Sequence, residues 1–259
     1  MTSETSATVQ TWREGRVGIV EMNKPPSNFF DEHTLRTVAE SLESFATDGE
    51  TRAVVLCSNG KHFCAGADLV SGRNVTDIRL AAETLYGYAL RIFAQPLPLV
   101  AAVQGAAVGG GLGLSLTADF RVCDTTARFT ANFARLGYHP GFGITVSLPR
   151  VVGAQRALEL MLSARNVHAD EALAIGLCDR LAEEGGARAG AIELATQLTE
   201  SGPLAVRAIR ATARAEFLAA LEAAIAHEID EQSWLMKTAD WREGVRASRD
   251  RRTPDFKGE

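Results

Sequence analysis

Three consecutive glycines, Gly109 to Gly111, stand between an apolar run and a segment with helical spacing, and the groups they offer for chemistry are backbone amides. Glycine has no Cβ atom, so another molecule can approach its peptide plane closely. If a helix runs from Gly110 to Leu116, its first N–H groups have no intrahelical acceptor. Such amides can stabilise negative charge on an oxygen. Tight packing of neighbouring elements is the alternative explanation for the glycines alone.

The glycine spacing does not fit the known phosphate-binding loops. Counting from Gly109, the sixth residue is Leu114, so the G-x-G-x-x-G fingerprint of dinucleotide-binding proteins is absent. The chain also lacks a G-x-x-x-x-G-K-[ST] loop. The glycine stretch therefore predicts a ligand other than a nucleotide phosphate held in one of these loops.

A second glycine-containing turn, K-H-F-C-A-G-A-D-L over residues 61–69, follows a strand-like apolar run over residues 53–58. Two such turns can face each other across one pocket and each offer one N–H to the same oxygen. A carbonyl held in this way becomes easier to attack or to enolise, because the developing charge meets donors that are already in place.

Taken together, these stretches resemble the crotonase family, also called the enoyl-CoA hydratase/isomerase family. The matching pieces are F-C-A-G-A-D-L, G-A-A-V-G-G-G-L, L-G-Y-H-P-G-F-G, A-L-A-I-G-L-C-D and R-R-T-P-D-F-K-G, and their order and spacing cover nearly the whole chain. The resemblance implies an acyl-CoA thioester as the substrate. Coenzyme A then enters as part of the substrate, and no cofactor or metal is bound permanently.

The resemblance assigns the thioester oxygen to the N–H groups of Ala67 and Gly110. It places the backbone around Ala65 and Asp68 at the adenine end of coenzyme A. In the tail it places Phe256 beside the adenine and Lys257 at a phosphate, and a solvated tail lysine is the alternative for Lys257.

A proline-rich loop, N-K-P-P-S-N-F-F, is expected to be extended, because proline lacks an N–H donor and disfavours helix in the residue before it. By resemblance this loop borders the pantetheine arm and brings Asn28 near the pocket. A plain turn before the next helix is the alternative. Phe133, Phe142 and Ile144 indicate an apolar site for the acyl group.

The chain departs from the family pattern where the hydratases carry two glutamates. These glutamates activate water and transfer the proton, which requires two carboxyl groups with tuned pKa values. The corresponding positions in this sequence are Gly113 and Phe133, and neither side chain can transfer a proton. We therefore expect ordinary hydration of an enoyl-CoA by the family mechanism to be very slow.

Two polar residues just before Pro140 are the remaining candidates for catalysis. Histidine titrates near neutral pH and suits acid/base chemistry, so His139 is the first candidate and Tyr138 the second. The alternative is that both side chains only line or support the loop. Asn132 is expected to be structural, and Glu228 is expected to be a surface charge on a helix.

Composition excludes several classes of protein. The 259 residues carry a formal net charge of −5, which argues against a nucleic-acid-binding surface. Cys57, Cys64, Cys123 and Cys178 form no C-x-x-C pair and are interpreted as reduced thiols. The N-terminus has no apolar signal segment, and the longest apolar region, residues 97–118, is interrupted by proline, glutamine and glycines. These features predict a cytoplasmic protein that does not span a membrane.

Strand-like and helical segments alternate over most of the chain, which predicts an α/β fold. The resemblance makes this a crotonase-like spiral of ββα repeats. We expect residues 1–200 to form the acyl-CoA-binding core and residues 201–259 a C-terminal helical region that, by resemblance, builds trimers or pairs of trimers. Helices are predicted over residues 31–45, 74–95, 110–116, 155–162, 170–175, 203–213, 216–237 and 240–248.

Three functions follow from these observations. The leading hypothesis is an enzyme that stabilises a thioester enolate or oxyanion and needs at most one weak side-chain base, as in isomerisation, thioester hydrolysis, decarboxylation or carbon–carbon cleavage. The second is a non-catalytic acyl-CoA carrier or sensor, because Gly113 and Phe133 leave the pocket apolar. The third is a hydratase that takes its acid/base group from elsewhere, such as Glu83.

Overall fold

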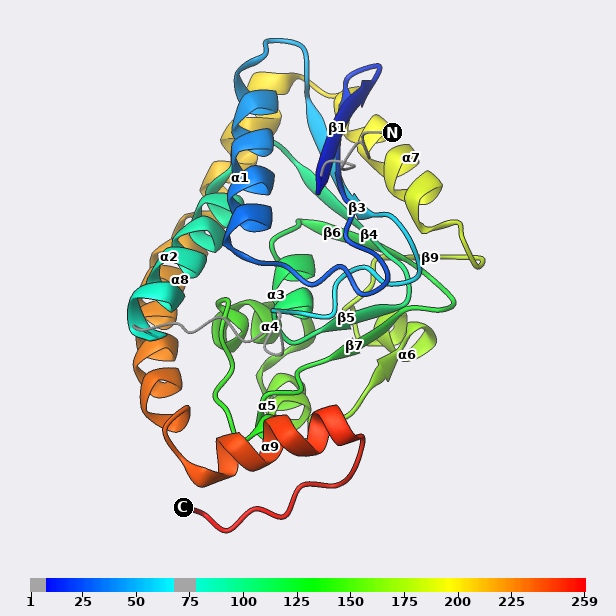
Figure 1. Cartoon of the computed structure of the whole chain (residues 1–259). Coiled ribbons are helices and arrows are strands. Elements are labelled where there is room, and N and C mark those ends of the chain that lie inside the picture. The colour runs from blue at the N-terminus through cyan, green and yellow to red at the C-terminus, as the bar shows by residue number, and fades with distance from the viewer. Residues whose placement is uncertain (1–7, 68–77) are drawn as a thin grey trace, which may run out of the picture.

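Two β-sheets organise the chain in a computed structural model that describes residues 8–67 and 78–259 (Figure 1). Among these residues the larger sheet has the strand order β1-β2-β3-β4-β6-β9, and the smaller has the order β5-β7-β8. The strands are β1 (Val9–Glu14), β2 (Val17–Met22), β3 (Ala53–Ser58), β4 (Leu99–Val103), β5 (Ala106–Val108), β6 (Phe120–Asp124), β7 (Arg128–Thr130), β8 (Val167–His168) and β9 (Arg180–Ala182).

The larger sheet begins as an antiparallel hairpin and continues as parallel strands. β1 and β2 are antiparallel, and β2, β3, β4, β6 and β9 pair in parallel. Every residue of β2, β3 and β4 is buried. Parallel strands buried on both faces read as continuous apolar runs, which is the pattern that the sequence carries here.

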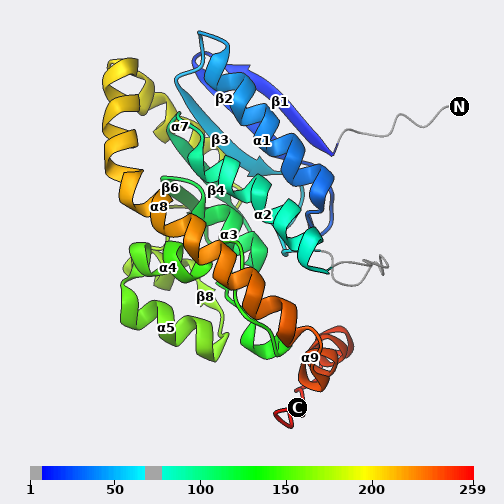
Figure 2. The ribbon, with the colours of Figure 1, turned by 90° about the vertical axis from the view of Figure 1, so that its left-hand side faces the viewer.

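Helices cover both faces of this sheet. α7 packs against β3, β4 and β6 on one face, while α1, α2 and α8 lie side by side over the other (Figure 2). The helices are α1 (Glu32–Thr47), α2 (Ile78–Ala94), α3 (Gly110–Leu116), α4 (Ile144–Val152), α5 (Ala154–Ser163), α6 (Ala169–Ala174), α7 (Ala187–Thr199), α8 (Pro203–Leu235) and α9 (Ala239–Asp250), with a short 3-10 turn, η1 (Ala134–Leu136).

The predicted α/β class is confirmed, but the prediction of two helices over residues 203–213 and 216–237 was wrong. The structure has one continuous helix, α8, across this stretch. Arg214 and Ala215 are good helix formers, and no glycine or proline interrupts the helix there. Arg214 also pairs with Asp119 at 2.8 Å, which anchors the middle of the helix on the sheet.

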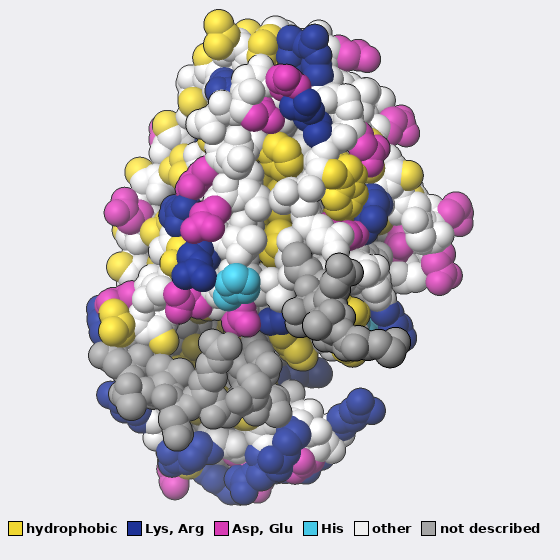
Figure 3. Space-filling model, turned by 45° about the horizontal axis from the view of Figure 1, so that its top comes forward, with side chains coloured by type: hydrophobic (Ala, Val, Ile, Leu, Met, Phe, Trp, Pro, Cys, Tyr) yellow, Lys and Arg dark blue, Asp and Glu magenta, His cyan; other side chains and the backbone are white. Residues whose placement is uncertain are grey.

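Charged side chains of both signs are scattered over the upper part of the face shown in Figure 3, and Lys and Arg side chains gather at its lower edge. None of the helices in the described part of the chain is both long and apolar enough to cross a lipid bilayer.

Candidate active site

The two glycine turns meet at the start of α3. Val108 donates its N–H to the carbonyl oxygen of Cys64 at 3.0 Å. A Cβ atom on Gly66 would lie 2.9 Å from the Val108 oxygen and 3.5 Å from the nitrogen of Gly110. A Cβ atom on Gly111 would lie 1.9 Å from the Cys64 oxygen. The approach of the two turns therefore depends on glycine at both positions.

A cavity of about 80 Å³ opens between these turns, and both Ala67 and Gly110 line it. Among the described residues, no group accepts a hydrogen bond from either N–H. The neighbouring N–H of Ala65, by contrast, donates to the carbonyl oxygen of Ser27 at 3.0 Å. The two amides that the sequence singles out thus border the same cavity and are not used by the protein's own described groups.

Most of the side chains that line the cavity are apolar. Of the described residues that form it, none carries a carboxylate, an imidazole, an amine or a guanidinium group. The described residues that line it are Phe30, Ala65, Gly66, Ala67, Leu85, Tyr86, Val108, Gly109, Gly110, Asn132, Phe133, Leu136, Tyr138, Gly141 and Phe142.

Phe142 occupies the space toward which a side chain at position 113 would point. A Cβ atom on Gly113 would lie 2.7 Å from the Cβ atom of Phe142. Phe142 has φ of +62°, a left-handed conformation that is unfavourable for a bulky residue. Its ring packs against Phe30 and Tyr86 with centroid separations of 5.6 and 6.2 Å. The packed ring leaves no room for a carboxylate at position 113.

Phe133 and Tyr138 form a second aromatic wall. Their rings stack with centroids 6.2 Å apart, and Trp241 of α9 meets the Tyr138 ring edge-on at 6.0 Å. Burial raises the pKa of Tyr138, so the phenol stays protonated at neutral pH. Its hydroxyl has no hydrogen-bond partner among the described residues. Tyr138 is therefore a proton donor without a partner in the cavity wall.

The structure separates the two candidates that precede Pro140. His139 does not line the cavity, and its Nδ1–H donates to the carbonyl oxygen of Pro140 at 2.7 Å. The His139 ring meets that of His227 at 6.0 Å on α8. Of the pair, only Tyr138 is placed to reach a molecule in the cavity.

Asn28 holds its own loop. Its Nδ2 donates to the carbonyl oxygens of Asn59 at 2.8 Å and His62 at 2.6 Å, and its Oδ1 accepts from the N–H of Lys24 at 2.8 Å. The side chain is buried and does not line the cavity. These bonds fit a plain turn before the next helix, which is the alternative role of this loop.

The tail residues lie apart from the cavity. Lys257 donates its N–H to Asp240 at 2.7 Å, and its side chain pairs with Asp255 at 2.8 Å. Neither Lys257 nor its neighbour Phe256 lines the cavity. Asp68, predicted to lie at the adenine end, is outside the described residues.

Two residues near the site lie in surroundings that differ from those predicted from the sequence. Asn132, expected to be structural, lines the cavity, and its Oδ1 lies 2.8 Å from where a Cβ on Gly109 would be. Its position two residues after the end of β7 was the available signal, since functional side chains often follow strand ends. Glu228 was expected at the surface, but it is fully buried and accepts the N–H of Gly143 at 2.7 Å.

In the described part of the chain, no group of three or more His, Cys, Asp or Glu side chains is arranged to hold a metal ion. Among the described residues that line the cavity, the polar groups without a hydrogen-bond partner include the N–H groups of Ala67 and Gly110, the Asn132 amide and the Tyr138 phenol, whereas the Tyr86 hydroxyl donates to Gln232.

Comparison with known proteins identifies the family. The model of the enoyl-CoA hydratase/isomerase family matches residues 13–259. The chain belongs to this family. Among relatives of the enoyl-CoA hydratase/isomerase family, 2,3-dehydroadipyl-CoA hydratase of Escherichia coli is 34% identical and covers 95% of this chain and 97% of its own length. The short-chain-enoyl-CoA hydratase of Clostridium acetobutylicum is 31% identical, with 91% and 92% covered.

Solved structures of enoyl-CoA hydratase/isomerase relatives share the fold. The carnitinyl-CoA hydratase from Mycobacterium avium superposes with a TM-score of 0.87 at 28% identity, covering 98% of this chain and 100% of the other. An enoyl-CoA hydratase/isomerase from Pseudoalteromonas atlantica T6c also gives 0.87 at 28% identity, with 97% and 100% covered. The mixed α/β fold with a C-terminal helical region, predicted from the resemblance, is confirmed.

Proposed function

We propose that this chain is an enzyme that acts on an acyl-CoA thioester, holding the thioester oxygen with the N–H groups of Ala67 and Gly110. The observation that carries the proposal is that both amides border one cavity and have no acceptor among the described residues. Two such donors stabilise an enolate or oxyanion, and loss of one typically costs about 2.7 to 4 kcal/mol in the transition state.

The side chains that line the cavity limit which reactions of an acyl-CoA thioester the site can catalyse. Hydration and isomerisation both begin with a base, but the described wall has no carboxylate or imidazole. Decarboxylation of a 2-carboxyacyl-CoA needs no base: the bond to the carboxylate breaks, carbon dioxide leaves, and the electron pair forms the enolate. A proton must then reach the α-carbon. Decarboxylation is therefore the reaction that this site supports best, ahead of carbon–carbon cleavage and thioester hydrolysis.

Tyr138 is the proposed proton donor in that last step. Its raised pKa keeps the phenol protonated, and its hydroxyl has no other partner among the described residues. Asn132 is the proposed hydrogen-bonding group for the leaving carboxylate, because it supplies the other polar side chain without a partner on the wall.

An assay on a panel of acyl-CoA thioesters tests the proposal. We expect malonyl-CoA or methylmalonyl-CoA to release carbon dioxide, and hydration of crotonyl-CoA to be undetectable. Tyr138→Phe should lower kcat by roughly 10²-fold or more with little change in KM, since it removes a proton donor used after binding. His139→Ala is the matched control and should retain the wild-type rate. Loss of turnover in His139→Ala but not in Tyr138→Phe would contradict the assignment of the donor.

A non-catalytic carrier or sensor is the second candidate, and the aromatic wall formed by Phe133, Tyr138 and Phe142 favours it. Saturable binding of acyl-CoA thioesters with no turnover of any member of the panel would select this function.

The third candidate, a hydratase that uses Glu83, has less support. Glu83 pairs with Arg79 at 2.8 Å on the exposed side of α2 and does not line the cavity. If the protein hydrates crotonyl-CoA and Glu83→Gln abolishes that activity, this third function would be supported.

A further inference from the structure

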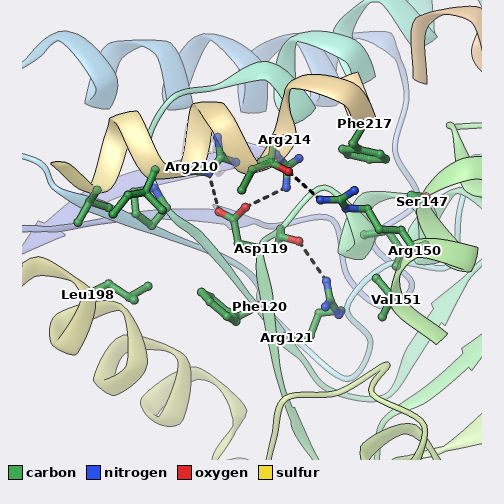
Figure 4. Close-up of a pocket in the computed structure, with 16 residues that line it drawn as sticks. Asp119, Phe120, Arg121, Ser147, Arg150, Val151, Leu198, Arg210, Arg214 and Phe217 are labelled. Carbon is green, nitrogen blue, oxygen red and sulfur yellow. Dashed lines mark hydrogen bonds and ion pairs between the residues drawn. The ribbon is translucent and has the colours of Figure 1, made fainter. Parts of the chain in front are cut away.

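A second and larger cavity lies away from the candidate active site. Its volume is about 460 Å³, and it is lined by the first half of α8 together with α4, α7 and the start of β6 (Figure 4). Small-molecule sites of roughly 300–1,000 Å³ are usually apolar with a few convergent polar groups. The apolar wall of this cavity includes Leu116, Phe120, Val151, Leu198, Val206 and Phe217.

One carboxylate in the cavity wall forms ion pairs with two guanidinium groups. Asp119 lies between Arg210, at 2.7 Å, and Arg214, at 2.8 Å (Figure 4). The arginine side chains are only 10% and 11% exposed. Burial lowers the pKa of Arg214 to about 10, and the nearby charge of Arg210 acts in the same direction. Nη2 of Arg210 and Nε of Arg214 are buried without an acceptor among the described residues. Asp119 alone therefore leaves this part of the wall positively charged.

Two further arginines face the same cavity. Arg121 pairs with Asp179 at 3.3 Å. Arg150, on α4, donates to the carbonyl oxygen of Ala213 at 2.8 Å and lies 5.2 Å from the centre of the Phe217 ring. No carboxylate in the described part of the chain pairs with Arg150. Four arginines thus face two carboxylates, which leaves an excess of two positive charges beside an apolar wall.

We propose that this cavity binds a small amphipathic anion, with a carboxylate or phosphate headgroup paired with Arg150 and an alkyl or aromatic body against the apolar wall. The planar fork of a guanidinium group matches both headgroups. An isolated anion would leave the apolar surface exposed, and a neutral apolar molecule would leave the excess charge unpaired. The site is separate from the thioester cavity, so the proposal does not depend on the proposed reaction.

Calorimetric titration of the full chain with octanoate, octyl phosphate and octanol tests the proposal. We expect one or both anions to bind saturably, the preferred headgroup to bind more tightly, and octanol to bind about tenfold more weakly or not at all. Arg150→Gln should weaken binding of the anion by about tenfold or more, since a hydrogen bond to a charged group is lost. Arg207→Gln is the matched control, because Arg207 also donates to a backbone carbonyl oxygen, that of Ala46, but does not line the cavity.

A second variant tests the space without changing the charge. Val206→Phe places a larger side chain in the apolar wall and should also weaken anion binding while leaving the stability of the fold largely intact. The proposal is overturned if neither anion binds saturably, or if Arg150→Gln and Arg207→Gln weaken binding equally. A third result would also overturn the proposal: Arg150→Gln changes the mass of the assembly in sedimentation but leaves anion binding unchanged. The face around Arg150 would then be an interface between copies of the chain.

Discussion

Glycine at position 113 and phenylalanine at position 142 are a matched pair. The helix α3 brings the Gly113 backbone so close to Phe142 that a single added methyl group meets the Phe142 Cβ atom at 2.7 Å. Phe142 in turn packs against Phe30, Tyr86 and Phe93. The absence of a carboxylate at position 113 is therefore part of the packing of this site as well as of its chemistry.

Gly113→Ala should destabilise the protein by about 1–3 kcal/mol, because overpacking a tight core forces its neighbours to move. Gly87→Ala is the matched control, since a Cβ atom on Gly87, in the helix α2, meets no atom within 4 Å. Removing glycine from an exposed helix interior should stabilise the protein by about 0.5–1 kcal/mol. Urea unfolding of both variants measures the two effects, and equal effects would show that position 113 has room.

At the scale of single elements, two carboxylates hold helix starts. Asp31 caps α1 by accepting the N–H of Thr34 at 2.9 Å and also bonds Lys24 at 3.0 Å. Glu228 reaches across from α8 to the start of α4, where it accepts the N–H groups of Gly143 and Thr145 at 2.7 and 3.0 Å. The cap by Asp31 is visible in the local sequence, whereas the bonds of Glu228 join elements that are far apart in the chain.

The cap at Asp31 should make the stability of the protein depend on pH. Burial acts to raise the pKa of Asp31, but the hydrogen bonds from Thr34 and Lys24 outweigh it and lower the pKa from 3.8 to about 2. Because the pKa of Asp31 is lower in the folded than in the unfolded state, its ionised carboxylate stabilises the folded protein at pH values above 3.8. This contribution to the free energy of unfolding is lost as the pH falls from 3.8 to about 2. Urea unfolding of wild type and Asp31→Asn should therefore differ at pH 7 and begin to converge by pH 3. A constant difference would contradict the assignment.

Glu228→Gln should destabilise the protein by about 1–3 kcal/mol, because an amide group replaces one of the two acceptor oxygens and leaves a buried donor at α4 unpaired. Glu222→Gln, an exposed change on the same helix, is the control and should have little effect. Thermal unfolding compares the two variants. An equal change in Tm would show that Glu228 has no role in holding α4.

The parts of the structure that the sequence predicted are those with local signals. The helix α3 begins at Gly110 and ends at Leu116 as predicted, and Asp31 marks the start of α1. The helices α4 and α7 were not predicted. α4 contains Pro149, and the long-range bonds of Glu228 to its start cannot be seen in a local pattern. Asn132 became a candidate only when β7 and the glycine turns were seen to meet, because a position after a strand does not show what the end of that strand faces.

At the scale of the whole molecule, α8 connects the two cavities. Its first half carries Arg210 and Arg214 at the larger cavity. Further along, Gln232 accepts the Tyr86 hydroxyl at 2.8 Å and donates to the carbonyl oxygen of His139 at 3.0 Å, next to the candidate active site. A helix rises about 1.5 Å per residue, so one unbroken element spans both regions.

The assembly state is a prediction at this scale. By likeness to the family we expect trimers or pairs of trimers, with the helical region of residues 201–259 at the contacts. Sedimentation equilibrium should give three or six times the chain mass of 27.7 kDa. A monomer at micromolar concentration would contradict this expectation.

The close fit of Phe142 against Gly113 also sets the order in which this site can change during evolution. A glutamate introduced at position 113 while the phenylalanine ring is present would clash with the ring and destabilise the fold. A smaller residue at position 142 would first have to open the space. The stepwise route that costs the fold least between this site and one with a carboxylate there therefore passes through an intermediate that is small at both positions.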